Sequence, residues 1–327
     1  MKAKMILSGV LAAFLILAAY FFIGFPSLSE GIVFGVNFSQ KHAKGLGLDW
    51  KETYLALLDD LKVKDIKLIT HWDLIEPERG NFCFGDLDWQ IEEAEKRNAK
   101  ILLVIGMKTG RWPECHIPEW AKGLDKTVQQ EEIIGLIEQI VLRYRERPSL
   151  SVWGVENEPL FPFGECPWID KEFLKREIDL VKSFDPEHPI LISDSGEGSL
   201  WIEVARLGDI VGTTIYKRVW IHNINRYFSY PFPSVFYRRK AELIKAFFGK
   251  EVICAELQAE PWCPNLLYNC SLEEQEKTMD LEQLKYNIKF AKNTGFDRFY
   301  LWGSEWWYWM KENQNRSEMW EEVRELF

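Results

Sequence analysis

Eight short apolar runs alternate with amphipathic segments from residue 32 to the C-terminus, and this alternation constrains the fold more than any other feature. The apolar runs predict strands at residues 32–37, 65–70, 100–105, 151–155, 189–193, 210–215, 251–255 and 298–301. The segments with helical spacing lie at residues 50–61, 87–97, 127–145, 171–184, 200–205, 234–248, 273–293 and 317–326. Strand–helix pairs in this number predict an α/β fold, a (β/α)8 TIM barrel.

An open, doubly wound sheet is the alternative architecture for such an alternation. The Gly-x-Gly-x-x-Gly turn that nucleotide-binding sheets carry after the first strand is absent from this sequence. Several strands are apolar throughout, as expected for parallel strands buried on both faces. The longest connections lead from strand to helix, at residues 106–126, 158–170, 216–233 and 256–272. We therefore favour the barrel and expect its functional site at the C-terminal ends of the strands.

Residues 5–25 form an uncharged, apolar run that is long enough to cross a bilayer as a helix. Lys2 and Lys4 precede this run, so the positive-inside rule predicts a cytoplasmic N-terminus and an exported remainder. We expect one N-terminal transmembrane helix before the barrel, with residues 1–29 as membrane anchor or signal segment and residues 30–327 as the catalytic domain. That domain would be membrane-anchored outside the cytoplasm, or secreted if a small-x-small sequence after the run is cleaved.

Composition narrows the classes of partner. The net charge of −10 argues against nucleic acid, whose phosphates require a basic surface. Six cysteines agree with an oxidising compartment, and the loop positions favour pairing of Cys115 with Cys166 and of Cys263 with Cys270. No paired Cys-x-x-Cys or His-x-His spacing is present, so we expect no metal, no cofactor and a monomeric protein.

Two glutamates carry the chemistry in this interpretation. Glu158 follows the fourth predicted strand in the sequence Asn-Glu-Pro, and Glu256 follows the seventh. If both face inward, they would lie about 5 Å apart, the separation of a retaining glycosidase pair. Repulsion at that distance keeps one carboxyl protonated, as general acid, while the other stays ionised, as nucleophile. The alternatives are a plain helix N-cap at the Asn-Glu-Pro motif, Glu260 as nucleophile, and a structural role for Glu156.

The Asn-Glu-Pro motif after a strand resembles the signature of glycoside hydrolase clan A, which includes cellulases, mannanases and β-galactosidases. Residues 72–80 resemble the segment after the second strand in families 42 and 5, and residues 256–262 resemble the nucleophile segment of family 42. The resemblance implies Glu158 as acid/base, Glu256 as nucleophile and Asn157 at the sugar 2-hydroxyl. Many clan members have an arginine in the second strand where this sequence has Lys67, which lacks the planar fork of a guanidinium.

Further residues at strand ends are candidates for sugar binding. By analogy with the clan, Tyr216 would donate to the nucleophile, and Trp302 would form the floor under the reacting sugar, with core packing as the alternative for each. The other candidates, for which packing is equally open, are His71, Trp72, Trp112 and Trp262. The predicted partner is an oligo- or polysaccharide. Hydrolysis of its β-glycosidic bond is the favoured function, with transglycosylation or a non-catalytic carbohydrate-binding barrel as alternatives.

Overall fold

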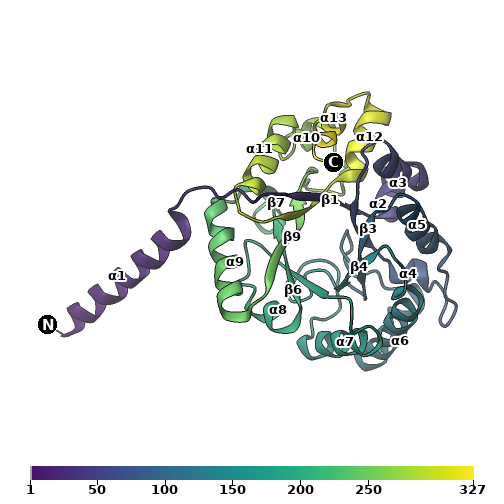
Figure 1. Ribbon diagram of the computed structural model, residues 1–327, viewed down its shortest axis with the longest axis horizontal. Coiled ribbons are helices and arrows are strands. Elements are labelled where there is room, and N and C mark those ends of the chain that lie inside the picture. Colours follow the sequence, from purple (N-terminus) through teal and green to yellow (C-terminus); the bar gives the residue numbers. More distant parts are fainter. Residues whose placement is uncertain (1) are drawn as a thin grey trace.

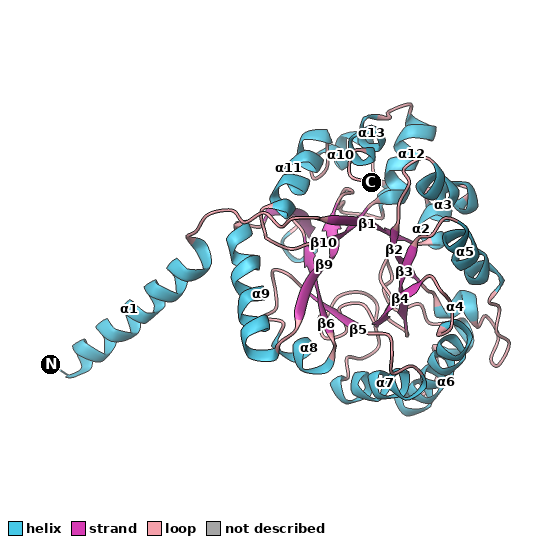
Figure 2. Cartoon of the chain, in the orientation of Figure 1, coloured by secondary structure: helices cyan, strands magenta, loops and turns pink. Residues whose placement is uncertain are grey.

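The computed structural model describes residues 2–327, apart from the side chains of residues 2–8 and 14, and confirms the (β/α)8 barrel. Eight parallel strands close in the order β1-β10-β9-β6-β5-β4-β3-β2, with helices around the outside (Figure 2). Their bounds are β1 Val33–Phe38, β2 Asp65–Ile69, β3 Lys100–Ile105, β4 Leu150–Val155, β5 Ile190–Asp194, β6 Ile210–Ile215, β9 Glu251–Gln258 and β10 Arg298–Trp302. All eight predicted strands are present, each within a few residues of its expected bounds.

The helices of the described chain are those that the apolar spacing predicts, with several additions. They are α1 Lys2–Phe22, α2 Gln40–Gly45, α3 Trp50–Asp59, α4 Trp72–Ile75, α5 Gly85–Lys96, α6 Lys126–Tyr144, α7 Lys171–Phe184, α8 Ile202–Leu207, α9 Ser234–Phe248, α10 Leu272–Glu276, α11 Leu281–Lys292, α12 Ser304–Gln314 and α13 Glu318–Arg324. The predicted helix at 273–293 is two helices, because the Asp280 side chain caps a new N-terminus at the Gln283 N–H. The long 216–233 connection contains an unpredicted hairpin, β7 Arg218–Ile221 with β8 Arg226–Ser229.

Alternation along each strand separates two apolar layers. Side chains that point outward pack under the helices and form the main core, as Ile66 and Leu68 of β2 do. Side chains that point inward form a second, smaller cluster: Leu102, Val104, Val152, Leu191, Ile253, Ala255 and Tyr300. Lys67 lies between Ile66 and Leu68, so its side chain points into the barrel, where it is 1 % exposed.

A β-bulge decides where Glu256 points. Strand β9 extends three residues beyond the predicted end, so Glu256 lies within the strand instead of after it. The register with β6 shifts between Thr213 and Thr214, which pair with Cys254 and Glu256 and leave Ala255 as the extra residue. Strict alternation would put Ala255 and Glu256 on opposite faces. The bulge lets both face inward, which simple strand periodicity does not reveal.

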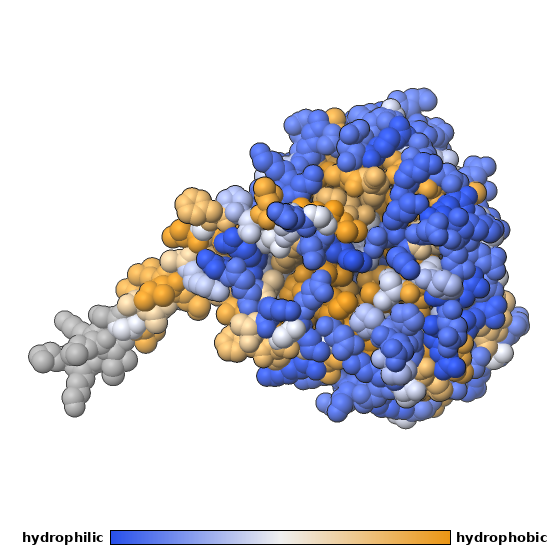
Figure 3. Space-filling view, in the orientation of Figure 1, coloured by the Kyte–Doolittle hydropathy of each residue, from blue (hydrophilic) through white to orange (hydrophobic). Residues whose placement is uncertain are grey.

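The N-terminal helix α1 extends away from the barrel and touches it only near its C-terminal end, against α9 (Figure 1). There the rings of Phe21 and Phe22 contact Phe236 at centroid distances of 5.8 and 5.7 Å. Apolar side chains nearer the N-terminal end of α1, such as Val10 and Leu11, are exposed. The outer rim of the barrel seen from the same side is mostly hydrophilic (Figure 3). No helix among the described residues combines the length and apolar content that crossing a membrane requires.

One of the two expected disulfides is present. Cys115 and Cys166 are bonded and join the β3–α6 loop to the β4–α7 loop. Cys263 and Cys270 are free thiols, which differs from the expected second bridge. Cys254 is a buried thiol inside β9, as its apolar surroundings predict.

Candidate functional site

The strand ends bring the two predicted catalytic glutamates into one buried network at the C-terminal end of the barrel. Glu158 lies three residues beyond β4, with its backbone N–H donating to Ser193 Oγ of β5 (2.8 Å). Its carboxyl accepts a hydrogen bond from Thr214 Oγ1 of β6 (3.3 Å). The φ of Glu158 is +44°, a left-handed conformation that side chains rarely adopt. Such backbone strain is typical of functional sites, where the surrounding fold holds a side chain in place.

Lys67 links the Asn-Glu-Pro motif to Glu256. Its Nζ donates to Asn157 Oδ1 and to Glu256 Oε1, both at 2.9 Å. The ion pair with Glu256 is almost fully buried on both sides. A lysine therefore stands where many clan members have an arginine, and it contacts the carboxylate directly. Ser193 Oγ donates a second hydrogen bond to Asn157 Oδ1, at 3.3 Å, so the amide orientation is set by two donors.

The two acids lie in different electrostatic environments. Burial raises the pKa of Glu158 well above its ordinary value, and the nearby charge of Glu256 raises it further. Glu256 instead accepts two hydrogen bonds, from Lys67 at 2.9 Å and from the hydroxyl of Tyr216 at 2.8 Å. Glu158 is thus suited to donate a proton near neutral pH, while Lys67 and Tyr216 hold the carboxyl of Glu256 in place.

The predicted sugar-binding residues fall into two groups. Trp302 and Tyr216 lie at the site, with Tyr216 on Glu256 and the ring of Trp302 between two cations, Arg111 and Lys67. Trp262 packs edge-on against Tyr216, with 5.0 Å between the ring centroids. Trp112 lies at the rim and is 49 % exposed, which leaves a flat aromatic surface open to solvent.

The other two predicted sugar-binding residues, Trp72 and His71, are buried in the protein interior. Trp72 is fully buried, and its indole N–H donates to Glu76 Oε2 at 2.8 Å, so it fills the core and has no atom available to a sugar. His71 is buried against His116, with its Nε2 3.0 Å from Ser39 Oγ. Burial first, and then the neighbouring cationic groups, lower the pKa of His71 well below its usual value. His71 is therefore a neutral ring that supports the neighbouring loop.

Two features of the site were not recognised in the sequence. The first is Glu114, a buried side chain of the β3–α6 loop whose Oε2 has no hydrogen-bond partner. Burial raises its pKa to about 7, partly offset by Lys108, and its charge in turn raises the pKa of Glu158. It follows a cis Trp112–Pro113 peptide and has a φ of +74°. No local motif marks such a residue, because only loop packing brings it to the site.

The second unrecognised feature is an aromatic strip formed by Trp112, Phe161, Phe163 and Trp262. Phe163 is central: its ring centroid lies 6.2 Å from that of Trp112, 6.5 Å from that of Phe161 and 5.7 Å from that of Trp262. Phe161 and Phe163 belong to the β4–α7 loop that also carries Glu158. The two phenylalanines, one residue apart in a loop, are the sequence signal for this strip.

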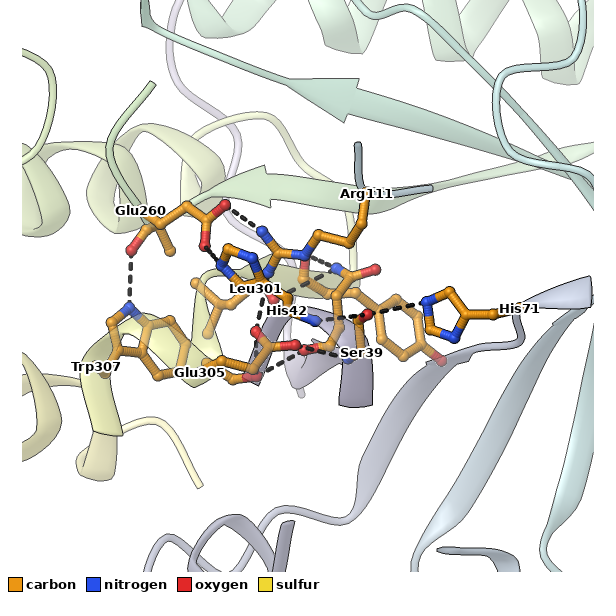
Figure 4. Close-up of polar contacts among 12 residues, drawn as sticks. Ser39, His42, His71, Arg111, Glu260, Leu301, Glu305 and Trp307 are labelled. Carbon is orange, nitrogen blue, oxygen red and sulfur yellow. Dashed lines mark hydrogen bonds and ion pairs between the residues drawn. The ribbon is translucent and has the colours of Figure 1, made fainter. Parts of the chain in front are cut away.

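A second set of charges lies beside Trp302, and we refer to its members His42, Arg111, Glu260 and Glu305 as the charged cluster. Arg111 pairs with Glu260 Oε1 and, at 2.9 Å, with Glu305 Oε2 (Figure 4). Its guanidinium carbon lies 4.2 Å from the Trp302 ring centroid. Burial opposes ionisation of Glu260, but Arg111 and then His42 outweigh it and lower its pKa to about 2. Glu260 is therefore committed to an ion pair with Arg111.

The charged cluster is also the one group of described residues with metal-ligand spacing. Ligand atoms of His42, Glu260 and Glu305 lie within 4.8 Å of one another. However, the guanidinium of Arg111 already supplies the positive charge between the two carboxylates. A divalent cation would have to compete with that fixed charge, so these residues do not fit a metal centre.

Comparisons with known proteins agree with this architecture. No protein-family model matches the chain. The chain is 21 % identical over 209 residues to mannan endo-1,4-β-mannosidase F of Aspergillus fumigatus, which covers 52 % of this chain and 47 % of that protein. The chain thus spans about half the length of the curated relative that it matches.

Solved structures with the same fold include a β-galactosidase of Rahnella sp. R3, with a TM-score of 0.62, 13 % identity and coverage of 93 % of this chain and 57 % of that one. A GH5_18 protein of Bifidobacterium longum aligns with a TM-score of 0.60, 15 % identity and coverage of 84 % and 70 %. Xylanase 10B of Thermotoga maritima aligns with a TM-score of 0.57, 16 % identity and coverage of 83 % of both chains. The chain therefore has the (β/α)8-barrel fold of glycoside hydrolases, as its resemblance to clan A leads one to expect.

Proposed function

We propose that this protein is a retaining glycoside hydrolase that cleaves β-glycosidic bonds. One observation carries the proposal: a glutamic acid held protonated, Glu158, shares a buried network with a second glutamate, Glu256, that accepts hydrogen bonds from a lysine and a tyrosine. This is the division of labour that double displacement requires. The mannosidase, xylanase and β-galactosidase named above support the proposal, because all are glycosidases by name.

In the first step, a Glu256 oxygen attacks the anomeric carbon of the sugar while Glu158 gives its proton to the departing glycosidic oxygen. The bond from the anomeric carbon to the leaving group breaks as the bond to Glu256 forms. In the second step, ionised Glu158 takes a proton from water, and the water oxygen displaces Glu256 from the sugar. Both carboxyls then return to their starting protonation states. Tyr216 and Lys67 stabilise the Glu256 carboxylate as it is released.

Substitution of each glutamate by glutamine tests this assignment, with aryl β-glycosides as substrates. Glu158→Gln removes the acid and Glu256→Gln the nucleophile, so each should lower kcat by at least about a hundredfold. Glu165→Gln, an exposed residue of the same loop as Glu158, is the matched control and should retain activity. If the parent protein binds glycans but cleaves none, the alternative of a carbohydrate-binding barrel holds. If it transfers the sugar to a second sugar rather than to water, it is a transglycosylase.

We propose in addition that the barrel acts outside the cytoplasm and is attached to a membrane through its N-terminal segment. The Cys115–Cys166 disulfide supports an oxidising compartment. The apolar side chains on α1 that are exposed, among them Val10, Leu11 and Ile16, support burial of this helix surface in a membrane. Cell fractionation tests this proposal. Recovery in the soluble cytoplasmic fraction would contradict it, and release from membranes without the first residues would indicate cleavage.

A further inference from the structure

We infer that the charged cluster closes the site at the sugar side, so that the protein removes single sugars from the non-reducing ends of glycan chains. The inference rests on the proposed function and adds a mode of action to it. It depends on three observations about His42, Arg111, Glu260 and Glu305: where they lie relative to Glu158, how firmly they are held, and which of their atoms lack partners.

The charged cluster lies across the barrel from the proposed acid. Glu158 contacts Ser193 of β5 and Thr214 of β6. By contrast, the carboxylates and the imidazole of the cluster follow β9, β10 and β1, and in the closed strand order β5 is opposite β1. The leaving group lies at Glu158, because that residue protonates the glycosidic oxygen. The sugar that is transferred must therefore extend away from Glu158, toward the cluster.

The position of Arg111 limits how far that sugar can extend. The backbone of the β3–α6 loop lies close to the site: a side chain at Gly110 would be 3.3 Å from Trp302 and 3.4 Å from Asn157. From the next residue, the Arg111 side chain reaches over Trp302 to the carboxylates of Glu260 and Glu305. The guanidinium therefore stands at the place where a second sugar unit would continue the chain.

The loop that carries Arg111 is fastened rather than free. The Glu156 carboxylate accepts hydrogen bonds from the backbone N–H groups of Met107 and Lys108, at 2.7 and 2.6 Å. The Cys115–Cys166 disulfide holds the loop again on the other side of Arg111. A loop that is anchored on both sides of Arg111 holds that side chain in a fixed position. A site that binds only the end of a glycan chain requires such a fixed boundary.

The wall also offers binding groups. Glu260 Oε2 and His42 Nε2 face each other at 3.3 Å as an ion pair whose geometry is too poor for a hydrogen bond. Such a poorly directed pair can exchange its contact for better directed hydrogen bonds to sugar hydroxyls. Sugar hydroxyls both donate and accept, so one hydroxyl of a terminal sugar can donate to the carboxylate while its neighbour contacts the imidazole.

The low exposure of the catalytic pair agrees with this closed geometry. Glu158 is 9 % exposed and Glu256 is 3 % exposed. An enzyme that cuts within polymers needs an open groove, through which the chain passes on both sides of the acids. On the Glu158 side, the aromatic strip with its exposed Trp112 provides a surface for the remaining chain. We therefore assign the aromatic strip to the leaving-group side of the site and the charged cluster to its closed side.

Digestion of β-1,4-linked manno-, xylo- and galacto-oligosaccharides that carry a label at the reducing end tests the inference. We expect the labelled chain to shorten by one sugar at a time, with a monosaccharide as the released product. Labelled fragments of all lengths at the earliest times would overturn the inference and leave the hydrolase assignment intact. Cleavage of none of these substrates, nor of any aryl β-glycoside, would instead contradict the proposed function.

Variants of the cluster provide a second readout. Arg111→Met removes the wall, so the ratio of turnover on aryl β-biosides to that on aryl β-monoglycosides should rise at least about tenfold. Arg79→Met, which breaks an exposed ion pair with Glu132, is the control and should leave the ratio unchanged. His42→Ala, at a less buried member, should raise KM for the monoglycoside more than it lowers kcat. A uniform loss on both substrates, with an unchanged ratio, would show that Arg111 only supports the fold.

Discussion

The ammonium of Lys67 and the carboxylate of Glu256 form a buried ion pair, with 2.9 Å between Nζ and Oε1. This pair joins β2 to β9 through the interior of the barrel, and the same Nζ also contacts Asn157. A guanidinium would present a planar pair of donors, whereas an ammonium distributes its donors among separate acceptors. Lysine at this position therefore serves both the nucleophile and the amide that precedes the acid.

Lys67→Met should abolish most activity and destabilise the protein. Removing one member of a buried ion pair leaves the other charge unpaired, which costs about 3–5 kcal/mol of unfolding free energy. We expect kcat/KM to fall at least about a hundredfold, since the proposed nucleophile would lose the ammonium that pairs with it and holds it in place. Kinetics and urea unfolding measure the two effects. Lys182→Met, which breaks an exposed pair with Asp209, is the control, and wild-type activity in Lys67→Met would refute the support role.

Glu114→Gln should move the alkaline limb of the pH–activity profile to lower pH. The proposed acid Glu158 must be protonated, so activity falls as pH rises through its raised pKa. The Glu114 charge is one cause of that raised pKa, after burial and Glu256. Removing the charge makes Glu158 easier to ionise and so lowers its pKa. The profile of kcat/KM measures this change, and Glu165→Gln should leave the profile in place. An alkaline limb that moves upward would contradict the assignment.

Glu177→Gln should stabilise the protein at neutral pH and above. Glu177 of α7 and Glu156 are buried together, and burial raises the pKa of Glu177 well above its ordinary value and that of Glu156 to about 7. The folded state thus holds protons that the unfolded state releases, so stability falls as pH rises from the unfolded pKa values toward the folded ones.

The amide that Glu177→Gln introduces would remain a donor to Glu156 without a proton to lose. We expect the free energy of unfolding to rise by roughly 1–3 kcal/mol at about pH 8 and to change little at about pH 4. The Oε1 atom of Glu177 is buried without a hydrogen-bond partner, which adds to the cost that the substitution relieves. Thermal unfolding across this range measures the effect. Glu172→Gln, exposed on the same helix, is the control. Equal gains at both pH values would show that the effect is packing rather than proton uptake.

Reduction of Cys115–Cys166 should weaken both stability and activity. The bridge closes a loop with a sequence separation of 51, for which loop entropy predicts a loss of about 4 kcal/mol. The loop also carries Arg111 and Glu114, so we expect KM to rise when the bridge is removed. Calorimetry and kinetics of Cys115→Ser with Cys166→Ser measure these effects. Cys83→Ser, at an exposed free thiol, is the control, and identical melting of the double variant and the parent would exclude a structural role for the bridge.

Local patterns were enough to predict the barrel and to propose the two glutamates as its acids. Strand and helix periodicities depend on neighbours within a few residues, and the (β/α)8 topology follows from their number and order. The Asn-Glu-Pro motif marks Glu158 because it follows a strand and resembles the clan A signature, although β4 itself already ends at Val155. Even so, the sequence predicted Glu256 after the end of its strand, whereas in the structure β9 continues to Gln258. The bulge at Ala255 then turns the Glu256 side chain toward the interior of the barrel. A bulge depends on pairing with the neighbouring strand, so the local sequence does not reveal it.

The amino-acid order by itself therefore determined the fold class, and it predicted the face of the barrel and the two glutamates of the proposed site. Only the tertiary structure decided that Lys67 contacts Glu256, that Glu114 joins the network, that Trp72 belongs to the core and that Arg111 reaches over Trp302. These contacts join residues far apart in the chain. They arise when the barrel closes and the loops pack against one another, and no short-range pattern encodes which loop side chains then meet.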